Sequence, residues 1–362
     1  MPVVDSITPF AWAPTGSSAP DSIALDNGTV WVAYTNGADS TGLFGDSTVV
    51  QYSASGVELH RYKLAGYVDG LKLDPDTGQM WAMQNQDGDS TLTTIDPVTH
   101  VVDGPFHYAA PSSTQGYDDV VFRSGQVFLS YTNPPGTSGD ATLVRLLDPT
   151  NLTAPLKTRT VLTDGTLGLD TVTGKMAIAP QTDPDSLKLA ANGDLIFSSG
   201  NDGDIIAIEH PGTPRQSMKF TPIKGVTPGN AGLDDVILPS ATSGTFYVSD
   251  AKNNRVLKVH ISGLNLNDYY ASVGSLKAFG QVDPSTGVFT PLISSANAPG
   301  FSFGSPHGVE FVPDAPAARA ASFVQHAASF AAAAGAGVDS RLMLADSGHH
   351  AFAALALSTP AR

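Results

Sequence analysis

The six residues 117-YDDVVF-122 return, little changed, as 233-LDDVIL-238. Both stretches place an aspartate ahead of the apolar alternation that is typical of a half-buried strand. The shared pattern is Asp, any residue, and then two apolar residues separated by one position. It occurs five times, and a sixth copy has His in the first place. The copies are 21-DSIAL-25, 69-DGLKL-73, 118-DDVVF-122, 185-DSLKL-189, 234-DDVIL-238 and 307-HGVEF-311.

Each copy is followed by a turn and further β-rich runs. In the first copy the turn 26-DNG-28 leads to 30-VWVAYT-35, and turn residues between apolar runs indicate hairpins. In the fifth copy we assign 246-FYVSD-250 and 255-RVLKVHI-261 to the second and third strands, and in the sixth copy 342-LMLAD-346 and 351-AFAALAL-357. A four-stranded unit that recurs about every 45 to 50 residues is typical of a β-propeller blade.

The sequence therefore predicts an all-β, six-bladed β-propeller with four-stranded blades and short helical or loop insertions. We expect one domain over residues 1–362, with the N-terminal strand near residues 3–10 as the outer strand of the last blade. That strand would close the ring and remove an exposed sheet edge. The blades are predicted to start near residues 21, 69, 118, 185, 234 and 307.

Composition limits the function. The 362 residues carry a formal charge of −15 and contain no cysteine. The charge argues against nucleic acid and anionic membrane surfaces as partners, and the missing cysteine excludes disulfides and thiolate chemistry. We expect a monomer that acts on a small-molecule substrate. The Ser, Thr and Asn content favours a periplasmic or secreted protein, although no signal-peptide pattern is present in this sequence.

The repeated aspartates are the candidate functional residues. In a propeller the first strand of each blade lines the central channel, so Asp21, Asp69, Asp118, Asp185, Asp234 and His307 should meet at one mouth. Two carboxylates about 5 Å apart repel by roughly 3 kcal/mol at an effective dielectric constant near 20. Either raised pKa values or a bound cation must compensate, and oxygen ligands favour Ca²⁺ first, then Mg²⁺ or Mn²⁺. The alternative is that each Asp only caps a turn.

Strict alternation along a strand has a second consequence. The second residues of the two aspartate pairs, Asp119 and Asp235, should face away from the channel and stabilise loops.

At this point the sequence resembles the superfamily of gluconolactonases, senescence marker protein, diisopropyl fluorophosphatase and strictosidine synthase. The stretches 247-YVSDAKNNRVLKVHISG-263 and 342-LMLADSGHHAFAAL-355 also resemble NHL-type repeats. In the hydrolases of this superfamily one Ca²⁺ is held by Glu, Asn and Asp at blade-initial positions, which implies metal ligands at Asp21, Asp118, Asp185 and Asp234. This sequence has 20-PDS-22 in place of the family's Glu-Gly-Pro start, and 306-PHG-308 is similar to its channel histidine motif.

The resemblance implies a metal-dependent hydrolase of a small ester or lactone, with His307 or Asp69 as the catalytic base. The hairpins after the second strands should form the substrate walls. Two alternatives stay open, namely a non-catalytic ligand-binding or interaction propeller with a structural ion, and a metal-assisted lyase or isomerase. The predicted substrate-binding residues are Thr35, Gln84, Thr132, Asn201 and Asp250.

Three segments interrupt the repeats. The alanine-rich stretch 315–334 has Phe323, Ala327 and Phe330 at helical spacing, which predicts an amphipathic helix. Segment 164–184 is either a lid over the aspartates or an extra hairpin. Segment 264–279 interrupts the fifth copy and has no assignment.

Overall fold

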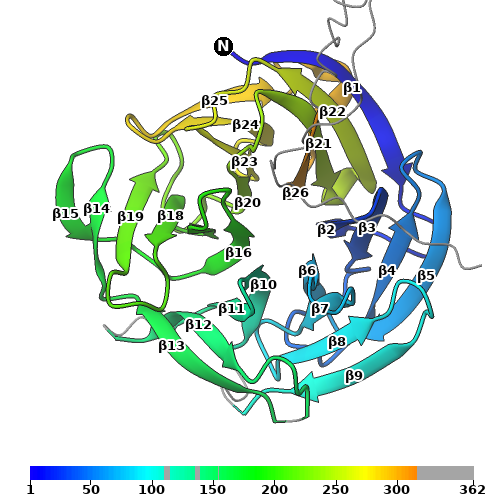
Figure 1. Ribbon diagram of the computed structural model, residues 1–362. Coiled ribbons are helices and arrows are strands. Elements are labelled where there is room, and N and C mark those ends of the chain that lie inside the picture. The colour runs from blue at the N-terminus through cyan, green and yellow to red at the C-terminus, as the bar shows by residue number, and fades with distance from the viewer. Residues whose placement is uncertain (110–114, 135–138, 154, 316–362) are drawn as a thin grey trace, which may run out of the picture. The chain divides into compact units, whose positions relative to one another are not determined.

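The computed structural model describes residues 1–109, 115–134, 139–153 and 155–315. Six sheets surround a central channel, as Figure 1 shows. Among the described residues, five sheets have four strands each and one has six. The predicted six-bladed β-propeller is thus confirmed. Residues Met1–Asp314 group into one compact unit, and the expectation of a single domain over the whole chain stays a prediction.

We number the blades by their innermost strands and name the strands from the channel outward. Blade 1 contains β2 (Pro20–Asp26), β3 (Thr29–Tyr34), β4 (Asp46–Tyr52) and β5 (Glu58–Ala65). Blade 2 contains β6 (Val68–Leu73), β7 (Met80–Gln84), β8 (Thr91–Ile95) and β9 (Val102–His107). Blade 3 contains β10 (Tyr117–Arg123), β11 (Gln126–Tyr131), β12 (Ala141–Leu147) and β13 (Lys157–Thr163).

Blade 4 is the six-stranded sheet. It contains β16 (Pro184–Leu189), β17 (Leu195–Ser199), β18 (Asp204–Glu209), β19 (Ser217–Pro222), β14 (Leu167–Asp170) and β15 (Lys175–Ile178). Strand β14 pairs in parallel with β19, so the hairpin β14–β15 extends the outer edge of the blade. The segment 164–184 is therefore an extra hairpin, and its strands do not form a lid over the channel.

In blades 5 and 6 the strands of one sheet do not follow one another in the sequence. Blade 5 contains β20 (Leu233–Ile237), β23 (Tyr269–Val273), β24 (Ala278–Asp283) and β25 (Val288–Ile293). Blade 6 contains β26 (Pro306–Pro313), β21 (Ser243–Asp250), β22 (Arg255–Ser262) and β1 (Val3–Trp12). Strand β1 pairs with β22 and is the outermost strand of blade 6.

The assignment of 246–250 and 255–261 to the fifth blade was wrong. The hairpin β21–β22 forms through local pairing, but β21 pairs on its other side with β26 of blade 6. The place beside β20 is taken by β23, which comes from the segment that had no assignment. Local hairpin signals do not reveal which inner strand the hairpin joins. The runs 342–346 and 351–357 and the predicted helix in 315–334 lie outside the described residues, apart from Ala315.

Apolar side chains fill the space between neighbouring blades. Trp31 of blade 1 belongs to the same buried cluster as Met80 of blade 2, and Phe128 of blade 3 shares a cluster with Phe197 of blade 4. All four are at most 1% exposed. Each such side chain contributes about 1.5–3 kcal/mol when it is fully buried. Packing between blades therefore holds the innermost strands around the channel.

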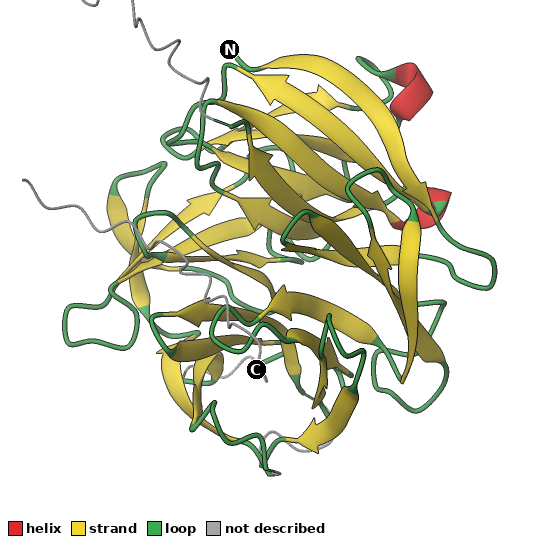
Figure 2. Ribbon diagram, turned by 45° about the vertical axis from the view of Figure 1, so that its right-hand side comes forward, coloured by secondary structure: helices red, strands yellow, loops and turns green. Residues whose placement is uncertain are grey.

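Tight turns and strands account for most of the described chain. The turn Asn27–Gly28 has positive φ at both residues, as the two-residue hairpin between β2 and β3 requires. Within the part of the chain that the structure describes, the two helices are the single turns η1 (Ala251–Asn253) and η2 (Pro299–Phe301), which Figure 2 shows in red. Among the described residues no helix has the length and apolar character needed to span a membrane.

Candidate metal centre at the channel mouth

Each innermost strand carries a β-bulge at the start of the repeated pattern. In blade 3, Asp118 and Asp119 together lie opposite the single residue Ser130. The same two-for-one shift occurs in the other five blades. A bulge interrupts the alternation of a strand and re-aims its side chains. The first residue of the pattern and the residue after it therefore both reach the channel.

The bulge overturns the expectation for Asp119 and Asp235. Both residues line the same small cavity as the blade-initial aspartates. Asp119 also links neighbouring blades, because its carboxylate accepts hydrogen bonds from the N–H groups of Val120 and Leu187. Asp235 does the same for Val236 and Val309. Strict alternation predicted that they face away, and that prediction was wrong.

Serines in the second strands satisfy the backbone at the bulges. Ser130 accepts a hydrogen bond from the N–H of Asp119, and Ser272 accepts one from the N–H of Asp235. Ser198 of blade 4 donates a hydrogen bond to the carbonyl of Asp234 in blade 5 at 2.5 Å. Because buried backbone groups need partners, these serines help to hold the aspartates at the channel.

Five blade-initial carboxylates meet in one cavity of about 10 Å³. This volume matches one water molecule or one ion, so the space between the carboxylates is too small for an organic substrate. The convergence predicted from the repeats is therefore present in the structure. The cavity-lining carboxylates are Asp21, Asp69, Asp118, Asp185 and Asp234.

Asp21, Asp234 and His307 form the tightest group. Each offers one ligand atom, and these atoms lie within 4.8 Å of one another. Nδ1 of His307 is 2.9 Å from Oδ1 of Asp234 and 3.2 Å from Oδ1 of Asp21. Tyr67 donates its hydroxyl to Oδ2 of Asp21 at 3.0 Å, and Nε2 of His307 lies 3.0 Å from Oγ of Ser305.

Burial and mutual repulsion shift the titration of these groups. The pKa of Asp69 is raised well above its usual value by burial and by Asp118, and the pKa of Asp185 is raised in the same way. Burial also raises the pKa of Asp234, although His307 opposes the shift. Burial alone would lower the pKa of His307, but Asp234 and Asp21 raise it well above 6.5. The site thus carries excess negative charge, which a cation would relieve.

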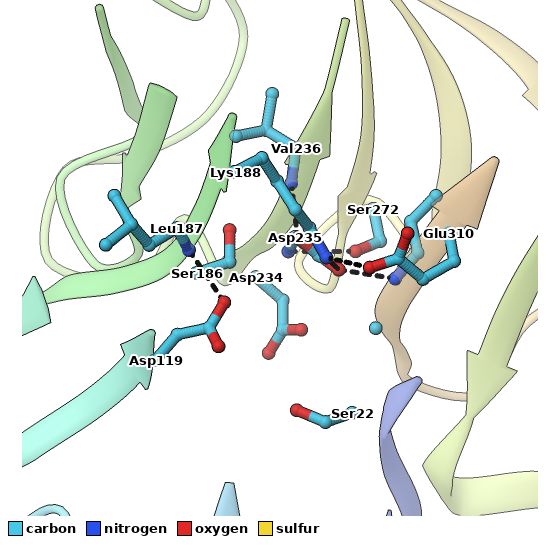
Figure 3. A network of polar contacts seen from close by, with 12 residues as sticks. Ser22, Asp119, Ser186, Leu187, Lys188, Asp234, Asp235, Val236, Ser272 and Glu310 are labelled. Atoms are coloured by element: carbon cyan, nitrogen blue, oxygen red, sulfur yellow. Dashed lines mark hydrogen bonds and ion pairs between the residues drawn. The ribbon is translucent and has the colours of Figure 1, made fainter. Parts of the chain in front are cut away.

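A second layer of polar side chains lies further along the channel from the blade-initial aspartates, and Figure 3 shows part of it. Nζ of Lys188 is 2.8 Å from Oδ2 of Asp235 and 3.0 Å from Oε1 of Glu310. Nζ of Lys72 is 3.2 Å from the same Glu310 oxygen and 3.9 Å from Asp119. Burial raises the pKa of Asp235 to about 6 even though both lysines oppose it. This ion-pair layer balances part of the negative charge of the channel.

The ion-pair layer separates the two ends of the channel. Lys72 and Lys188 line the small cavity between the aspartates and also a cavity of about 380 Å³ beyond it. Burial alone would lower the pKa of Lys188, but Asp235, Glu310 and Asp119 raise it well above its ordinary value. The ammonium group is therefore a permanent cation beneath the site.

Four of the five predicted substrate-binding residues are buried, and their polar groups are engaged within the chain. Gln84 bonds the carbonyl of Ala65 and the hydroxyl of Thr93. Thr35 donates to the carbonyl of Ala19, and Thr132 to Asp183. The fourth, Asp250, is fully buried. Only the fifth, Asn201, is exposed, so it alone of the five presents its side chain to solvent.

Sequence reasoning missed several residues at the site. Lys72, Lys188 and Glu310 occupy the position three residues after the blade-initial residue, where the other copies have Ala24, Val121 or Ile237. Charged residues at an otherwise apolar repeat position were a signal that these strands face one another in the channel. Tyr67 and Ser305 precede their strands and had no such signal.

Comparisons with known proteins concern the fold. No protein-family model matches the sequence, and no curated protein matches it either. Similar solved structures include the periplasmic gluconolactonase of Pseudomonas aeruginosa, with 13% identity, a TM-score of 0.48, and coverage of 81% of this chain and 88% of that chain. Virginiamycin B lyase from Staphylococcus aureus has 12% identity, a TM-score of 0.47, and coverage of 85% and 96%.

A calcium-binding regucalcin from Agrobacterium tumefaciens has 14% identity, a TM-score of 0.45, and coverage of 76% of both chains. The structural neighbours thus include a gluconolactonase, which is one of the kinds of protein that the sequence resembles, and a regucalcin. At these identities the likeness concerns the arrangement of the blades and not the chemistry of the channel.

Proposed function

We propose that this propeller is a divalent-cation-dependent hydrolase of a small ester or lactone. The observation that carries the proposal is the meeting of Asp21, Asp234 and His307, whose ligand atoms lie within 4.8 Å of one another. Two carboxylates and an imidazole are a donor set that divalent ions accept. Asp118 and Asp185 line the same cavity and supply further oxygen ligands.

The donor set bears on the identity of the ion. Carboxylate ligands alone favour Ca²⁺, whereas an imidazole ligand shifts the preference toward an ion such as Mn²⁺. Ca²⁺, Mg²⁺ and Mn²⁺ are therefore the ions to compare. The lysine of the ion-pair layer, Lys188, lies too close to compensating carboxylates to replace such an ion.

Each residue of the site would have a separate role in ester hydrolysis. When bound, a divalent cation polarises a carbonyl group and lowers the pKa of water. Asp21, Asp234 and His307 would hold it, and Asp69 would accept the proton from the attacking water. Burial raises the pKa of the Asp69 carboxyl group well above its usual value, which makes its carboxylate a stronger base than an ordinary one. Because the cavity between the carboxylates holds only one water or ion, the substrate would bind above the ring, on the open side of the channel mouth.

The test uses the whole chain stripped with a chelator and reloaded with each ion. A panel of lactones, aliphatic esters and phosphotriesters should show turnover that disappears on chelation and returns on reloading. Asp234→Asn should abolish turnover, while Asp283→Asn, at the half-buried end of strand β24 in blade 5, should not. Turnover that is indifferent to chelation and to Asp234→Asn would contradict the proposal.

The cavity of about 10 Å³ also favours a second candidate, a propeller that holds a structural ion without catalysis. In that case cation binding would stabilise the fold, but no compound in the panel would react. Product analysis in ¹⁸O-labelled water separates hydrolysis from lyase chemistry, because only hydrolysis incorporates the label into the product.

A further inference from the structure

The turn of the β21–β22 hairpin holds the loop that leads to His307. Oδ1 of Asp250 accepts hydrogen bonds from the backbone N–H groups of Gly304 and Ser305, at 2.9 and 3.1 Å. The N–H of Ala251 donates to the carbonyl of Ser305 at 2.9 Å. The predicted substrate residue Asp250 is thus an anchor for the loop 302–305.

Two more side chains of the same turn complete the anchor. Asn253 and Arg255 both donate to Oδ2 of Asp250, at 2.7 and 3.2 Å. Both also donate to the carbonyl of Ser302, at 3.3 and 2.8 Å. We call Asp250, Asn253 and Arg255 the loop clamp. All three residues lie in the stretch 247–263, which has no role in the proposed reaction.

The loop clamp acts on His307 through Ser305. Pro306 lies between these two residues and fixes its own φ angle, so little freedom is left between the clamped backbone of Ser305 and the imidazole. Oγ of Ser305 lies 3.0 Å from Nε2 of His307. On the opposite side of the ring, Nδ1 faces Asp234 and Asp21. Both ring nitrogens of His307 are therefore engaged.

We infer that Ser305 is a positioning residue for His307 and that the loop clamp sets its orientation. The inference rests on the proposed function, because it concerns the Nδ1 atom that would face the cation. A histidine that ligates an ion through one nitrogen needs a partner for the N–H of the other nitrogen. Ser305 is that partner, since an Nε2–H donor and a hydroxyl acceptor leave the Nδ1 lone pair free to ligate.

The same hydrogen bond serves the protein without an ion. In one ring orientation Nδ1 faces the two carboxylates and Nε2 faces Oγ of Ser305. Loading and unloading the ion would then leave the ring in one orientation, and no side-chain rearrangement would oppose binding. Preorganisation of this kind increases affinity because less ordering is required on binding.

The experiment compares wild type with Ser305→Ala, Ser305→Thr and the control Ser285→Ala, an exposed serine in a turn of blade 5. Calorimetric titration with Ca²⁺ and Mn²⁺ should show affinity weakened about 10- to 100-fold in Ser305→Ala. The threonine variant keeps the hydroxyl and should stay close to wild type. Asn253→Ala removes one exposed side chain of the loop clamp and should give a smaller loss of cation affinity than Ser305→Ala.

A measurement on the chelator-treated protein makes the test independent of the cation. In ¹⁵N-edited spectra of protein with labelled histidine, the Nε2–H proton of His307 should be protected from water exchange in wild type and in Ser305→Thr. It should exchange rapidly in Ser305→Ala. Urea midpoints equal to that of Ser285→Ala would show that the fold is retained.

Unchanged Nε2–H protection together with unchanged affinity in Ser305→Ala would overturn the inference. If wild type bound no divalent cation, the proposed function would fail instead. The exchange measurement would then still decide whether Ser305 positions the ring.

Discussion

Nδ1 of His307 lies 2.9 Å from Oδ1 of Asp234, although the two residues begin different blades. This pairing exists because the innermost strands β20 and β26 both start at the same mouth of the channel. It joins the one imidazole of the repeated pattern to the carboxylates, and it is the contact on which the cation hypothesis depends.

The first prediction concerns removal of the cation. A ligand present at 100 times its dissociation constant stabilises a protein by about 2.7 kcal/mol. Chelation should therefore lower the melting temperature of wild type by roughly 5 °C or more. Asp234→Asn should melt at the same temperature with and without chelator, whereas Asp283→Asn should respond like wild type. Scanning calorimetry at fixed protein concentration makes the comparison, and an identical wild-type melting temperature in both buffers would argue against a bound ion.

The second prediction is that one channel carboxylate destabilises the protein when no cation is present. The pKa of Asp118 is raised well above its usual value by burial and by Asp119 and Asp183. The stability that this group contributes is present below its unfolded pKa and is lost as pH rises through the folded pKa. In chelator at pH 8, Asp118→Asn should thus be more stable than wild type by about 1–2 kcal/mol.

Urea unfolding at pH 5 and pH 8 measures the effect. The gain should shrink as the pH is lowered from 8 to 5, because burial and the neighbouring carboxylates favour the protonated form of Asp118 in the folded protein. A destabilised Asp118→Asn variant at pH 8 in chelator would show that the carboxylate is held by compensating partners, and the excess-charge argument would be wrong.

The third prediction concerns the seam where the ring closes. His260 of β22 contacts Asp5 of β1 at 3.0 Å and Asp314, just beyond β26, at 3.1 Å. Burial alone would lower the pKa of His260, but the two carboxylates raise it. Its stabilising contribution is therefore fully present below the unfolded pKa of about 6.5, and it is lost as pH rises through the folded pKa.

The variant His260→Gln should lose stability at pH 5.5 and behave like wild type at alkaline pH. The difference should remain below about 1 kcal/mol, because exposed ion pairs contribute little. Urea midpoints of the two proteins across this pH range provide the measurement. An equal loss at every pH would mean that packing, and not the charge of His260, accounts for the effect.

The fourth prediction concerns the ion-pair layer. Lys188→Met removes the cation between Asp235 and Glu310, so that Asp235 loses its nearest cation and Glu310 keeps only Lys72. Loss of one partner from a buried pair costs about 3–5 kcal/mol. The exposed Lys175→Met should be close to neutral.

The double variant Lys188→Met with Glu310→Gln provides the internal check by urea unfolding. It should recover part of the loss, because one of the two negative charges that Lys188 balanced is then gone. Additive losses in the double variant would mean that the two side chains do not interact energetically.

Much of the architecture could be predicted from the repeats. The Asp-led pattern marks six innermost strands, since each copy combines strand periodicity with following turns. The meeting of Asp21 and Asp234 at one cavity follows from that arrangement. The sequence could not predict that Asp119 also turns inward, because a bulge has no signal in a period-two pattern. Its partner Ser130 becomes recognisable only when the pairing register is known.

The exchange of strands between blades 5 and 6 could not be predicted from the sequence either. The sequence pattern of the hairpin β21–β22 is the same whether the hairpin pairs with β20 or with β26, because the pairing between its own two strands is local. The choice depends on which other strands compete for each inner edge, and β23 occupies the edge of β20. That choice places Asp250 beside the loop before His307.

By itself, the amino-acid order determined the repeat, the strand periodicity and the identity of the residues that open each innermost strand. These are local properties, set by side-chain alternation and turn chemistry. Only the tertiary structure decided which strands share a sheet, which side chains the bulges turn inward, and how Ser305 and the loop clamp engage His307. Those contacts join segments far apart in the chain, and their geometry depends on how all six blades pack around one axis.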